Sequence, residues 1–587
     1  MKVKAMFLFA LLCIVAQGAW ATDYNVSNET ELRGAIENGA NITLTQDITI
    51  GSAITFNDGI TVTINLGGHT LNRNSTSDNR SQVIGVFSGS TLNISNGTLT
   101  GGWGGDGGII NQATLNMTNV TINGNKGNDR GGGISNNGTL TMTGCTVRNN
   151  TSRDGTSPAG GGGIFNYNGK TATLTNCTIT GNTASTYAGG GICNYGTMTL
   201  NNCSITNNNA TTKGGGIFCS TTSTLSINGC TITGNSAGSY GDGIYIDNST
   251  FNMQGLCTVT GNTDSNIYLY GSGTKITVTG AFTDGSDIGV GFSDYDRKFT
   301  SGYSDYNSGT DPGNYFSSDN YKYGIGEKDG EAFPGITYWD HSWEGGDTDG
   351  HVVSTQKLCT NYTIYSGETK IEGDKWYLLS GETSYDNRLT INDLHVKFIL
   401  MDGCNVEFKK GIYIRNTLSI YAQTHGTGKL RCSSDGSSQS TYSDAALGGE
   451  YNKQGGHLTI HGGYIEAKPG DANSAAIGGG SCKESDTRPQ GGMSSITIWD
   501  GNIKAEGKSS GAGIGTGQNN GRFPEITIYG GTINAKGGSY AAGIGGGESN
   551  KNGVIKIYGG NITAQGGSDG AGIGGGENGN MGGEITI

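Results

Sequence analysis

The sequence predicts an all-β chain that forms a right-handed parallel β-helix (a solenoid), with two consecutive β-helical domains. Between residues 131 and 244 a glycine cluster followed by an isoleucine occurs five times, and the isoleucines are 30, 28, 25 and 27 residues apart. Each cluster precedes a short run in which apolar residues alternate with Thr, Ser or Asn, the pattern of a half-buried strand. Near the C-terminus a second repeat spaces its isoleucines 30, 29 and 30 residues apart. Repeats of about 20–50 residues are typical of solenoids.

Residues 1–21 have the pattern of a secretion signal. Lys2 and Lys4 precede an apolar stretch, and Ala19-Trp20-Ala21 forms a small-residue cleavage site before Thr22. No later apolar run reaches about 20 residues, so no transmembrane segment is expected in the mature chain. We therefore expect export to the extracellular space or to the outer cell surface of a bacterium.

Composition excludes several classes of protein. Glycine is abundant, at 108 residues, but there are only 6 prolines, which excludes collagen. The net charge of −13 is dispersed along the chain and does not suit binding to nucleic acid. Of twelve cysteines, Cys13 lies in the signal, and the odd number that remains does not fit a closed disulfide framework.

The first β-helix is expected over residues 22–282. Asn28 and the apolar positions of 29–36 predict a capped amphipathic helix that covers the open end of the coils. In the coils that follow, one column of positions holds cysteine and is expected to be a stack of buried, free thiols: Cys145, Cys177, Cys203, Cys230 and Cys257. Two further columns hold asparagines, which are expected to bond to one another at the bends.

Residues 283–356 interrupt the repeat and are expected to form an irregular cap and linker rich in Tyr, Asp and Gly. Trp339, His341, Trp343 and Glu344 lie close together here, and either pack as a cap or bind sugar. The segment 347–350 resembles a calcium loop but lacks the third acid and the terminal Glu of that motif. We expect no metal and no cofactor.

The second β-helix is expected over residues 357–587. Its repeat reads Ile-Thr-Ile, an aromatic residue or histidine, and then a glycine-rich turn. His457 and His461 lie on one such repeat and are expected to be surface histidines. Because the chain stops on the first strand of a coil, at Ile585-Thr586-Ile587, we expect the sequence to be a fragment of a longer protein.

The repeats of the first β-helix resemble a known family. Gly-Gly-Gly-Ile alternating with Ile/Val-x-x-Asn, over roughly residues 90–265, is similar to the repeats of bacterial polymorphic outer-membrane proteins and related adhesins, and residues 61–71 resemble the entry coils of pectin-lyase-like β-helices. The resemblance implies export to the cell surface and adhesion. Its motif positions are the turn glycines and the asparagines, so it implies a scaffold and no catalytic residues.

One edge of the first β-helix is the candidate ligand surface. The loop before each glycine cluster varies from coil to coil, and stacking of the coils would align its charged and aromatic residues in a stripe that is suited to an extended glycan. The same Asp and Gly residues are also ordinary turn formers. The stripe consists of Trp103, Asp106, Asp129, Arg130, Asp154, Tyr187, Lys213, Tyr240 and Asp242.

Three functions remain open. An adhesin or structural stalk fits the export signal, the repeats and the lack of a visible cluster of carboxylates, metal ligands or a nucleophile. A non-catalytic carbohydrate-binding β-helix fits if the stripe converges on a polysaccharide or host glycan. A polysaccharide lyase or glycoside hydrolase requires acids from separate coils to meet in a groove, so we expect no enzyme.

Expression with export should yield a mature chain that begins at Thr22, because the cleavage site precedes this residue. Intact-mass measurement of the secreted protein checks this. Retention of residues 1–21 would contradict it.

Overall fold

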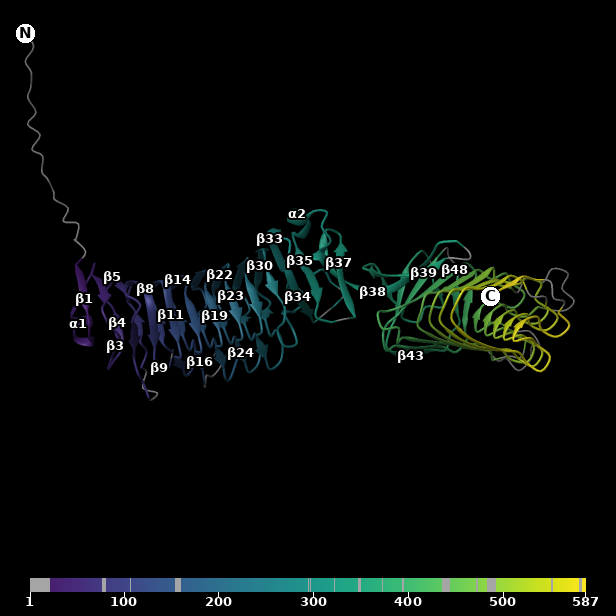
Figure 1. The fold of residues 1–587 in the computed structure, drawn as a ribbon, viewed down its shortest axis with the longest axis horizontal. Helices are drawn as coiled ribbons and strands as arrows, with labels where there is room; N and C mark the ends of the chain where they lie inside the picture. The colour runs from purple at the N-terminus through teal and green to yellow at the C-terminus, as the bar shows by residue number, and fades with distance from the viewer. Residues whose placement is uncertain are drawn as a thin grey trace, which may run out of the picture. The chain divides into compact units, whose positions relative to one another are not determined.

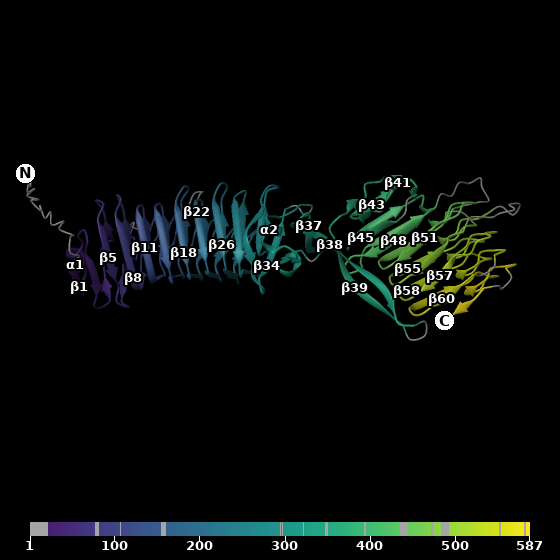
Figure 2. The same cartoon turned by 90° about the horizontal axis from the view of Figure 1, so that it is seen from above.

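The computed structural model describes residues 22–76, 81–105, 107–153, 160–293, 295, 297–320, 322–346, 350–371, 373–392, 395–434, 444–470, 473–482, 492–550, 553–579 and 583–587. The chain divides into two compact units: residues 1–320 with 327–334, and residues 321–326 with 335–587. In each unit parallel strands stack coil upon coil (Figures 1 and 2). This arrangement, together with the near absence of helix, confirms the predicted fold class of a right-handed parallel β-helix.

Four columns of strands build the first unit, and each strand pairs in parallel with its counterpart one coil away. The first column is β1 (Asp23–Val26), β2 (Asn41–Leu44), β5 (Thr61–Asn65), β8 (Thr91–Thr100), β11 (Thr114–Asn123), β14 (Thr139–Thr143), β18 (Thr171–Thr175), β22 (Thr197–Asn201), β26 (Thr224–Asn228), β30 (Thr250–Gly255), β33 (Ile276–Phe282) and β35 (Thr300–Ser301). The second adds β3 (Ile48–Thr49), β6 (Thr70–Asn72), β15 (Thr146–Arg148), β19 (Thr178–Thr180), β23 (Ser204–Thr206), β27 (Thr231–Thr233), β31 (Thr258–Val259), β34 (Asp287–Phe292) and β36 (Phe316–Ser318).

The third column includes the isoleucine after each glycine cluster: β4 (Ile54–Phe56), β7 (Ile84–Val86), β10 (Ile109–Asn111), β13 (Ile134–Asn136), β17 (Ile164–Asn166), β21 (Ile192–Asn194), β25 (Ile217–Cys219), β29 (Ile244–Asp247) and β32 (Ile267–Tyr270). The fourth is a separate short sheet, made of β9 (Trp103–Gly104), β12 (Lys126–Gly127), β16 (Thr151–Ser152), β20 (Thr183–Ala184), β24 (Asn209–Ala210) and β28 (Ser236–Ala237).

Three parallel sheets build the second unit. The first sheet is β40 (Thr363–Ile364), β42 (Trp376–Leu379), β45 (Val396–Leu400), β48 (Thr417–Ala422), β51 (His457–Ile460), β54 (Ser495–Ile498), β57 (Glu525–Ile528), β60 (Ile555–Ile557) and β63 (Ile585–Thr586). The second is β41 (Lys370–Ile371), β44 (Leu389–Ile391), β47 (Ile412–Ile414), β50 (Leu447–Gly448), β53 (Ile477–Gly478), β56 (Ile514–Gly515), β59 (Ile544–Gly545) and β62 (Ile573–Gly574). The third is β43 (Glu382–Tyr385), β46 (Asn405–Phe408), β49 (Lys429–Ser433), β52 (Tyr464–Lys468), β55 (Asn502–Glu506), β58 (Thr532–Lys536) and β61 (Asn561–Gln565).

The predicted N-terminal helix is α1 (Glu29–Gly34). Asn28 caps it by accepting the Glu31 N–H at 3.0 Å, and Leu32 is buried against the coils. The only other helices in the described residues are α2 (Tyr303–Asn307) and the 3-10 turn η1 (Pro312–Asn314). None of these helices is long and apolar enough to cross a membrane.

The cysteine column is confirmed as a stack of buried, free thiols. Its five members, from Cys145 to Cys257, point into the core at consecutive coils and are at most 2% exposed. Burial raises the pKa of Cys257 to about 11, so this thiol stays protonated at neutral pH. A protonated, buried thiol behaves as a small apolar side chain and is poorly reactive.

Both asparagine columns form hydrogen-bonded ladders. In the longer ladder each side-chain amide donates to the side-chain oxygen of the next asparagine at 3.0–3.1 Å, and the same oxygen accepts the backbone N–H of its neighbour at 2.9–3.0 Å. We call this the amide ladder; its members are Asn125, Asn150, Asn182, Asn208, Asn235 and Asn262. The shorter ladder connects Asn111, Asn136, Asn166 and Asn194 at 2.7–2.9 Å.

The interval 283–356 is more regular than the predicted irregular linker. Residues 287–318 contain β34, β35 and β36, which pair with coils of the first unit. Strand β37 (Tyr323–Lys328) follows. Strands β38 (Glu331–Glu344) and β39 (His351–Cys359) then form a long antiparallel hairpin, paired from Ile336–Cys359 to Glu344–His351. Its alternation of aromatic and polar residues is a strand pattern that does not share the period of either repeat. The predicted calcium-like segment at 347–349 lies outside the described residues.

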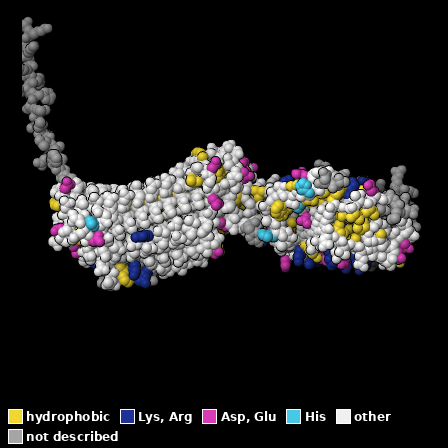
Figure 3. Space-filling model, viewed as in Figure 1, with side chains coloured by type: hydrophobic (Ala, Val, Ile, Leu, Met, Phe, Trp, Pro, Cys, Tyr) yellow, Lys and Arg dark blue, Asp and Glu magenta, His cyan; other side chains and the backbone are white. Residues whose placement is uncertain are grey.

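The third sheet of the second unit has alternating charges on its outer face. Arg431 lies 3.4 Å from Glu466, Lys504 lies 3.0 Å from Glu466 and 3.2 Å from Glu506, and Lys468 lies 3.3 Å from Glu506. Charged side chains gather along one edge of this unit (Figure 3). A slip of two residues between β52 and β55 would place Glu466 opposite Glu506, or Lys468 opposite Lys504, so this pattern favours the observed register.

Replacing Asn182 by Ala should lower the free energy of unfolding of the first unit by about 2–4 kcal/mol. The substitution leaves the backbone N–H and the side-chain amide of Asn150 without their common acceptor, and each buried unsatisfied donor costs about 1–3 kcal/mol. Urea titration followed by circular dichroism measures the change. Thr171→Ala, at an exposed position of the same coil, is the control, and equal effects of the two substitutions would contradict the prediction.

Candidate binding groove

A column of aromatic side chains runs along the outside of the first sheet of the second unit. Each follows an inward-pointing isoleucine such as Ile460 or Ile498, so strand alternation turns it outward. Parallel in-register pairing then stacks the rings, with successive centroids 4.2, 6.3, 4.0 and 5.1 Å apart and ring planes within 18° of parallel. We call this the aromatic ladder: Tyr421, His461, Trp499, Tyr529 and Tyr558.

The β38–β39 hairpin packs against the aromatic ladder. Trp343 lies 5.0 Å from Tyr529 and 4.9 Å from Tyr558, and His341 lies 5.9 Å from His461 (ring centroids). His461 is therefore only 6% exposed, which corrects its prediction as a surface histidine; an outward position is buried where another element covers it. His457 is exposed, as predicted.

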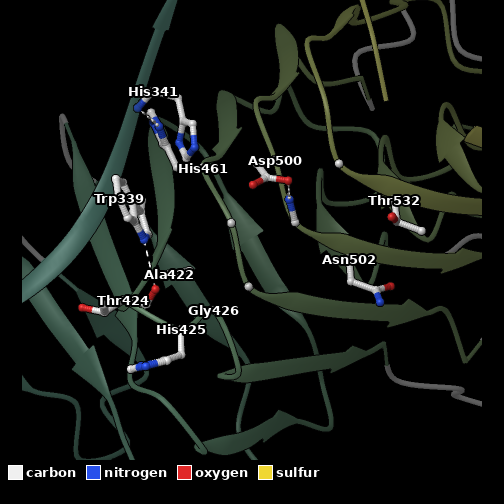
Figure 4. Close-up of a pocket in the computed structure, with 14 residues that line it drawn as sticks. Trp339, His341, Ala422, Thr424, His425, Gly426, His461, Asp500, Asn502 and Thr532 are labelled. Carbon is white, nitrogen blue, oxygen red and sulfur yellow. Dashed lines mark hydrogen bonds between the residues drawn. The ribbon is translucent and has the colours of Figure 1, made fainter. Parts of the chain in front are cut away.

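An open cavity of about 610 Å³ lies between the hairpin and the coils (Figure 4). We call it the groove. Side chains of three origins line it: Trp339 and His341 from the hairpin, Thr424 and His425 from a loop after β48, and residues from successive coil corners. The corner residues with side chains are His461, Asp500, Asn502 and Thr532, and the remaining lining consists of Ala422, Gly426, Gly462, Gly463, Gly501 and Gly531.

Glycines form the floor of the groove because the coil corners require them. Gly463, Gly501 and Gly531 have φ values of 92°, 119° and 90°, and a Cβ on Gly501 would lie 2.9 Å from the carbonyl oxygen of Gly463. These residues stack in register, so a strip without side chains runs along the coils. Beside it, Asn502 and Thr532 are exposed on consecutive rungs.

Hydrogen bonds fix the loop that forms one wall. The Trp339 indole N–H donates to the Thr424 carbonyl oxygen at 3.0 Å. The Asp402 carboxylate, whose side chain is 4% exposed, accepts from the backbone N–H groups of His425 and Thr427 at 3.0 and 3.2 Å. Its Oδ2 also lies 3.1 Å from His425 Nδ1, so an ionised Asp402 places the imidazole proton on Nδ1.

His461 of the coils and His341 of the hairpin, which face each other, are uncharged at neutral pH. Burial lowers the pKa of His461 to about 4, against the opposing effect of Asp340, whose Oδ1 lies 3.3 Å from His461 Nδ1. Burial also lowers the pKa of His341. Lys357 lies 2.5 Å from the other oxygen of Asp340, and this ion pair joins the two strands of the hairpin.

The predicted stripe of the first unit contains pairs of cations and aromatic rings. Lys126 Nζ lies 4.5 Å and the Arg153 guanidinium 5.6 Å from the Trp103 ring. The Arg130 guanidinium lies 5.3 Å from the Tyr167 ring, and Lys213 Nζ donates to the Tyr245 hydroxyl at 3.0 Å. These contacts hold the cations against the wall of the coil.

Other members of the stripe differ in exposure. Tyr240 is 50% exposed and stacks on Tyr268 at 4.7 Å, Tyr187 packs against Phe218, and Asp129 is exposed. Asp242 is only 1% exposed and accepts from the N–H groups of Ala237 and Ser265 at 2.7 and 2.9 Å, as part of a turn. Asp106 and Asp154 lie outside the described residues.

The sequence interpretation did not single out Asp500, Asn502, Thr532, Thr424 or His425. One signal was available: the position after each isoleucine of the second repeat is aromatic or His, and Asp500 interrupts the glycines that follow it. In the described residues there is no group of three or more His, Cys, Asp or Glu side chains that is suited to hold a metal ion.

Comparisons with known proteins support a β-helix repeat protein. Residues 151–283 match a family model described as a right-handed beta helix region, and residues 458–481, 496–518, 526–548 and 555–577 match a model of the beta helix repeat. No curated protein and no solved structure matches the chain.

Acidification from pH 7 to pH 4.5 should loosen the hairpin. The folded pKa of His461 lies below its ordinary value of 6.5, so the undocked state binds the proton more tightly and stability falls as pH drops through this interval. At about 1.4 kcal/mol per pKa unit the loss approaches about 3 kcal/mol. Asp340, Lys357, His341 and His395 are the charged or titratable groups that act on this imidazole.

Hydrogen exchange of residues 339–359 as a function of pH measures this opening. His461→Phe keeps a stacked ring but removes the titration, so it should flatten the pH dependence. His457→Phe, at the exposed histidine of the same strand, should not. An unchanged pH profile in His461→Phe would show that other groups control the hairpin.

Proposed function

We propose that this β-helix repeat protein is an exported, non-catalytic adhesin that binds polysaccharide or a cell-surface glycan in the groove of its second unit. The observation that carries the proposal is the glycine-floored strip along the coils, with an indole at one wall and polar side chains on successive rungs. An extended chain ligand with its own repeat suits such a strip, because each coil offers it a similar set of contacts.

The chemistry of the groove supports a sugar ligand. Thr424, Asn502 and Thr532 offer hydroxyl and amide groups, which both donate to and accept from sugar hydroxyls. Trp339 supplies an apolar ring surface. The ring faces of the aromatic ladder cover one another, and among the described lining residues only His461 belongs to the ladder, so we assign the ladder to positioning the hairpin and not to sugar stacking.

The small number of carboxylates in the groove favours binding without catalysis. Glycoside hydrolysis generally uses two carboxyl groups that flank one bond. Of the described lining residues only Asp500 carries a carboxylate, and the nearby Asp340 is paired with Lys357. Export rests on the signal-like residues 1–21, and burial makes the free thiols of the cysteine column poorly reactive, so they are compatible with an oxidising compartment.

The mature chain should bind at least one polysaccharide in a glycan array, and Asn502→Ala and Trp339→Ala should each weaken binding at least tenfold, about 1.4 kcal/mol. Asn534→Ala is the matched control, since Asn534 lies on the same outer face of β58 as Thr532 but outside the groove lining. Isothermal titration with the array hits gives the affinities.

The outcomes separate the alternatives. Absence of any glycan binding would sink the proposal and leave a structural stalk. Binding that survives both groove substitutions but is lost in Lys213→Ala or Tyr240→Ala would move the site to the stripe of the first unit. Release of new reducing ends from the bound polymer would identify an enzyme.

A further inference from the structure

We infer that the groove selects uncharged glycans over acidic ones, and that Asp500 is the residue that sets this selectivity. The inference rests on the proposed function, since it specifies the class of ligand for the same groove.

Asp500 occupies a special position in the coil corner. The register of β54 with β51 and β57, continued two residues beyond Ile498, places Asp500 beside Gly462 of the preceding coil and Gly530 of the following one, so its side chain rises from a strip of glycines. Asp500 is exposed, and one of its oxygens accepts the N–H of Gly501 at 2.7 Å, which fixes the direction of the carboxylate. Figure 4 shows it between His461 on one side and Asn502 and Thr532 on the other.

No cation among the described residues of the groove lining offsets this carboxylate. The lining contains no Lys or Arg. His341 and His461 are neutral at pH 7 because burial lowers the pKa of each, the His425 imidazole lies 3.1 Å from the Asp402 carboxylate, and Lys357 of the hairpin is paired with Asp340. The groove therefore carries negative charge at neutral pH.

A carboxylate on the floor of an open groove discriminates between sugars. A uronate or sulfate ester in the strip would lie close to Asp500, and the two like charges would repel each other, most strongly at low ionic strength. Sugar hydroxyls have the opposite effect, because a carboxylate only accepts hydrogen bonds and binds hydroxyl donors strongly. An uncharged glycan gains this interaction without the repulsion.

Titration of the mature chain with matched oligosaccharides of equal length tests the inference: a neutral glucan, a uronan and a cationic amino-glycan, at low ionic strength. The wild type should bind the neutral ligand at least tenfold more tightly than the uronan. Asp500→Asn should reduce this ratio at least threefold, and Asp500→Lys should invert it. Asp569→Asn removes the same charge at an exposed site outside the groove lining and should leave the ratio unchanged.

Several results would overturn the inference. The wild type could bind the neutral ligand and the uronan with equal affinity, and Asn502→Ala could abolish this binding. That result would leave the proposed function intact and refute only the selectivity. Weaker binding of the cationic amino-glycan than of the uronan, or a ratio that is the same in Asp500→Asn, would also refute it. Absence of binding to all three ligands, and to the wider array, would refute the proposed function itself.

Discussion

The amide ladder is the interaction on which the first unit depends. Each of its asparagines is buried where the chain turns, so its donors and acceptors must be satisfied by protein. The next asparagine, one coil away, supplies that partner, and the same oxygen also accepts a backbone N–H at the bend. The spacing between successive asparagines of the ladder therefore varies from 25 to 32 residues through the length of the loops, while the bend itself stays in register. Because the amide ladder keeps the bends in register, the cysteine column and the isoleucines that follow the glycine clusters are also aligned from coil to coil.

In the second unit, glycines instead of asparagines occupy the coil corners beside the groove. Its corners beside the groove pack backbone against backbone, as at Gly501 over Gly463. Two consequences follow for the groove. The missing side chains create its floor, and the close coil spacing stacks the aromatic ladder, which gives the hairpin a surface to pack on. The candidate site thus arises from the packing rule of the scaffold, with Asp500 as the local exception.

The period of the sequence repeats predicts which residues stack in columns along the coils, and these columns account for most of the fold. The thiol stack, both asparagine ladders and helix α1 follow from residue spacing and capping alone. The groove does not follow from residue spacing. It depends on contacts between the hairpin and the coils, such as that of His341 with His461, which are 120 residues apart in the sequence. Alternation correctly placed His461 outward but carries no information about what covers it. Asp242 shows the same limit for the first unit. The sequence predicts that it belongs to an exposed stripe, but it is buried because its carboxylate accepts hydrogen bonds from the backbone of a turn.

The amide ladder also has a direction. From Gly102, whose N–H donates to Asn125, each side-chain amide of the ladder donates to the side-chain oxygen on its C-terminal side, through Asn262 to Asn266, and the last acceptor is the carboxylate of Asp319. The same amide groups also donate to backbone carbonyls of the preceding coil, as Asn150 does to Ile122 at 3.0 Å. Burial raises the pKa of this carboxyl group, while the donors that end on it act in the opposite sense. Aligned dipoles of this kind polarise one another. The repeat is consequently open to lengthening in its middle, where a whole added coil brings one donor and one acceptor, but its two ends are chemically different and not interchangeable.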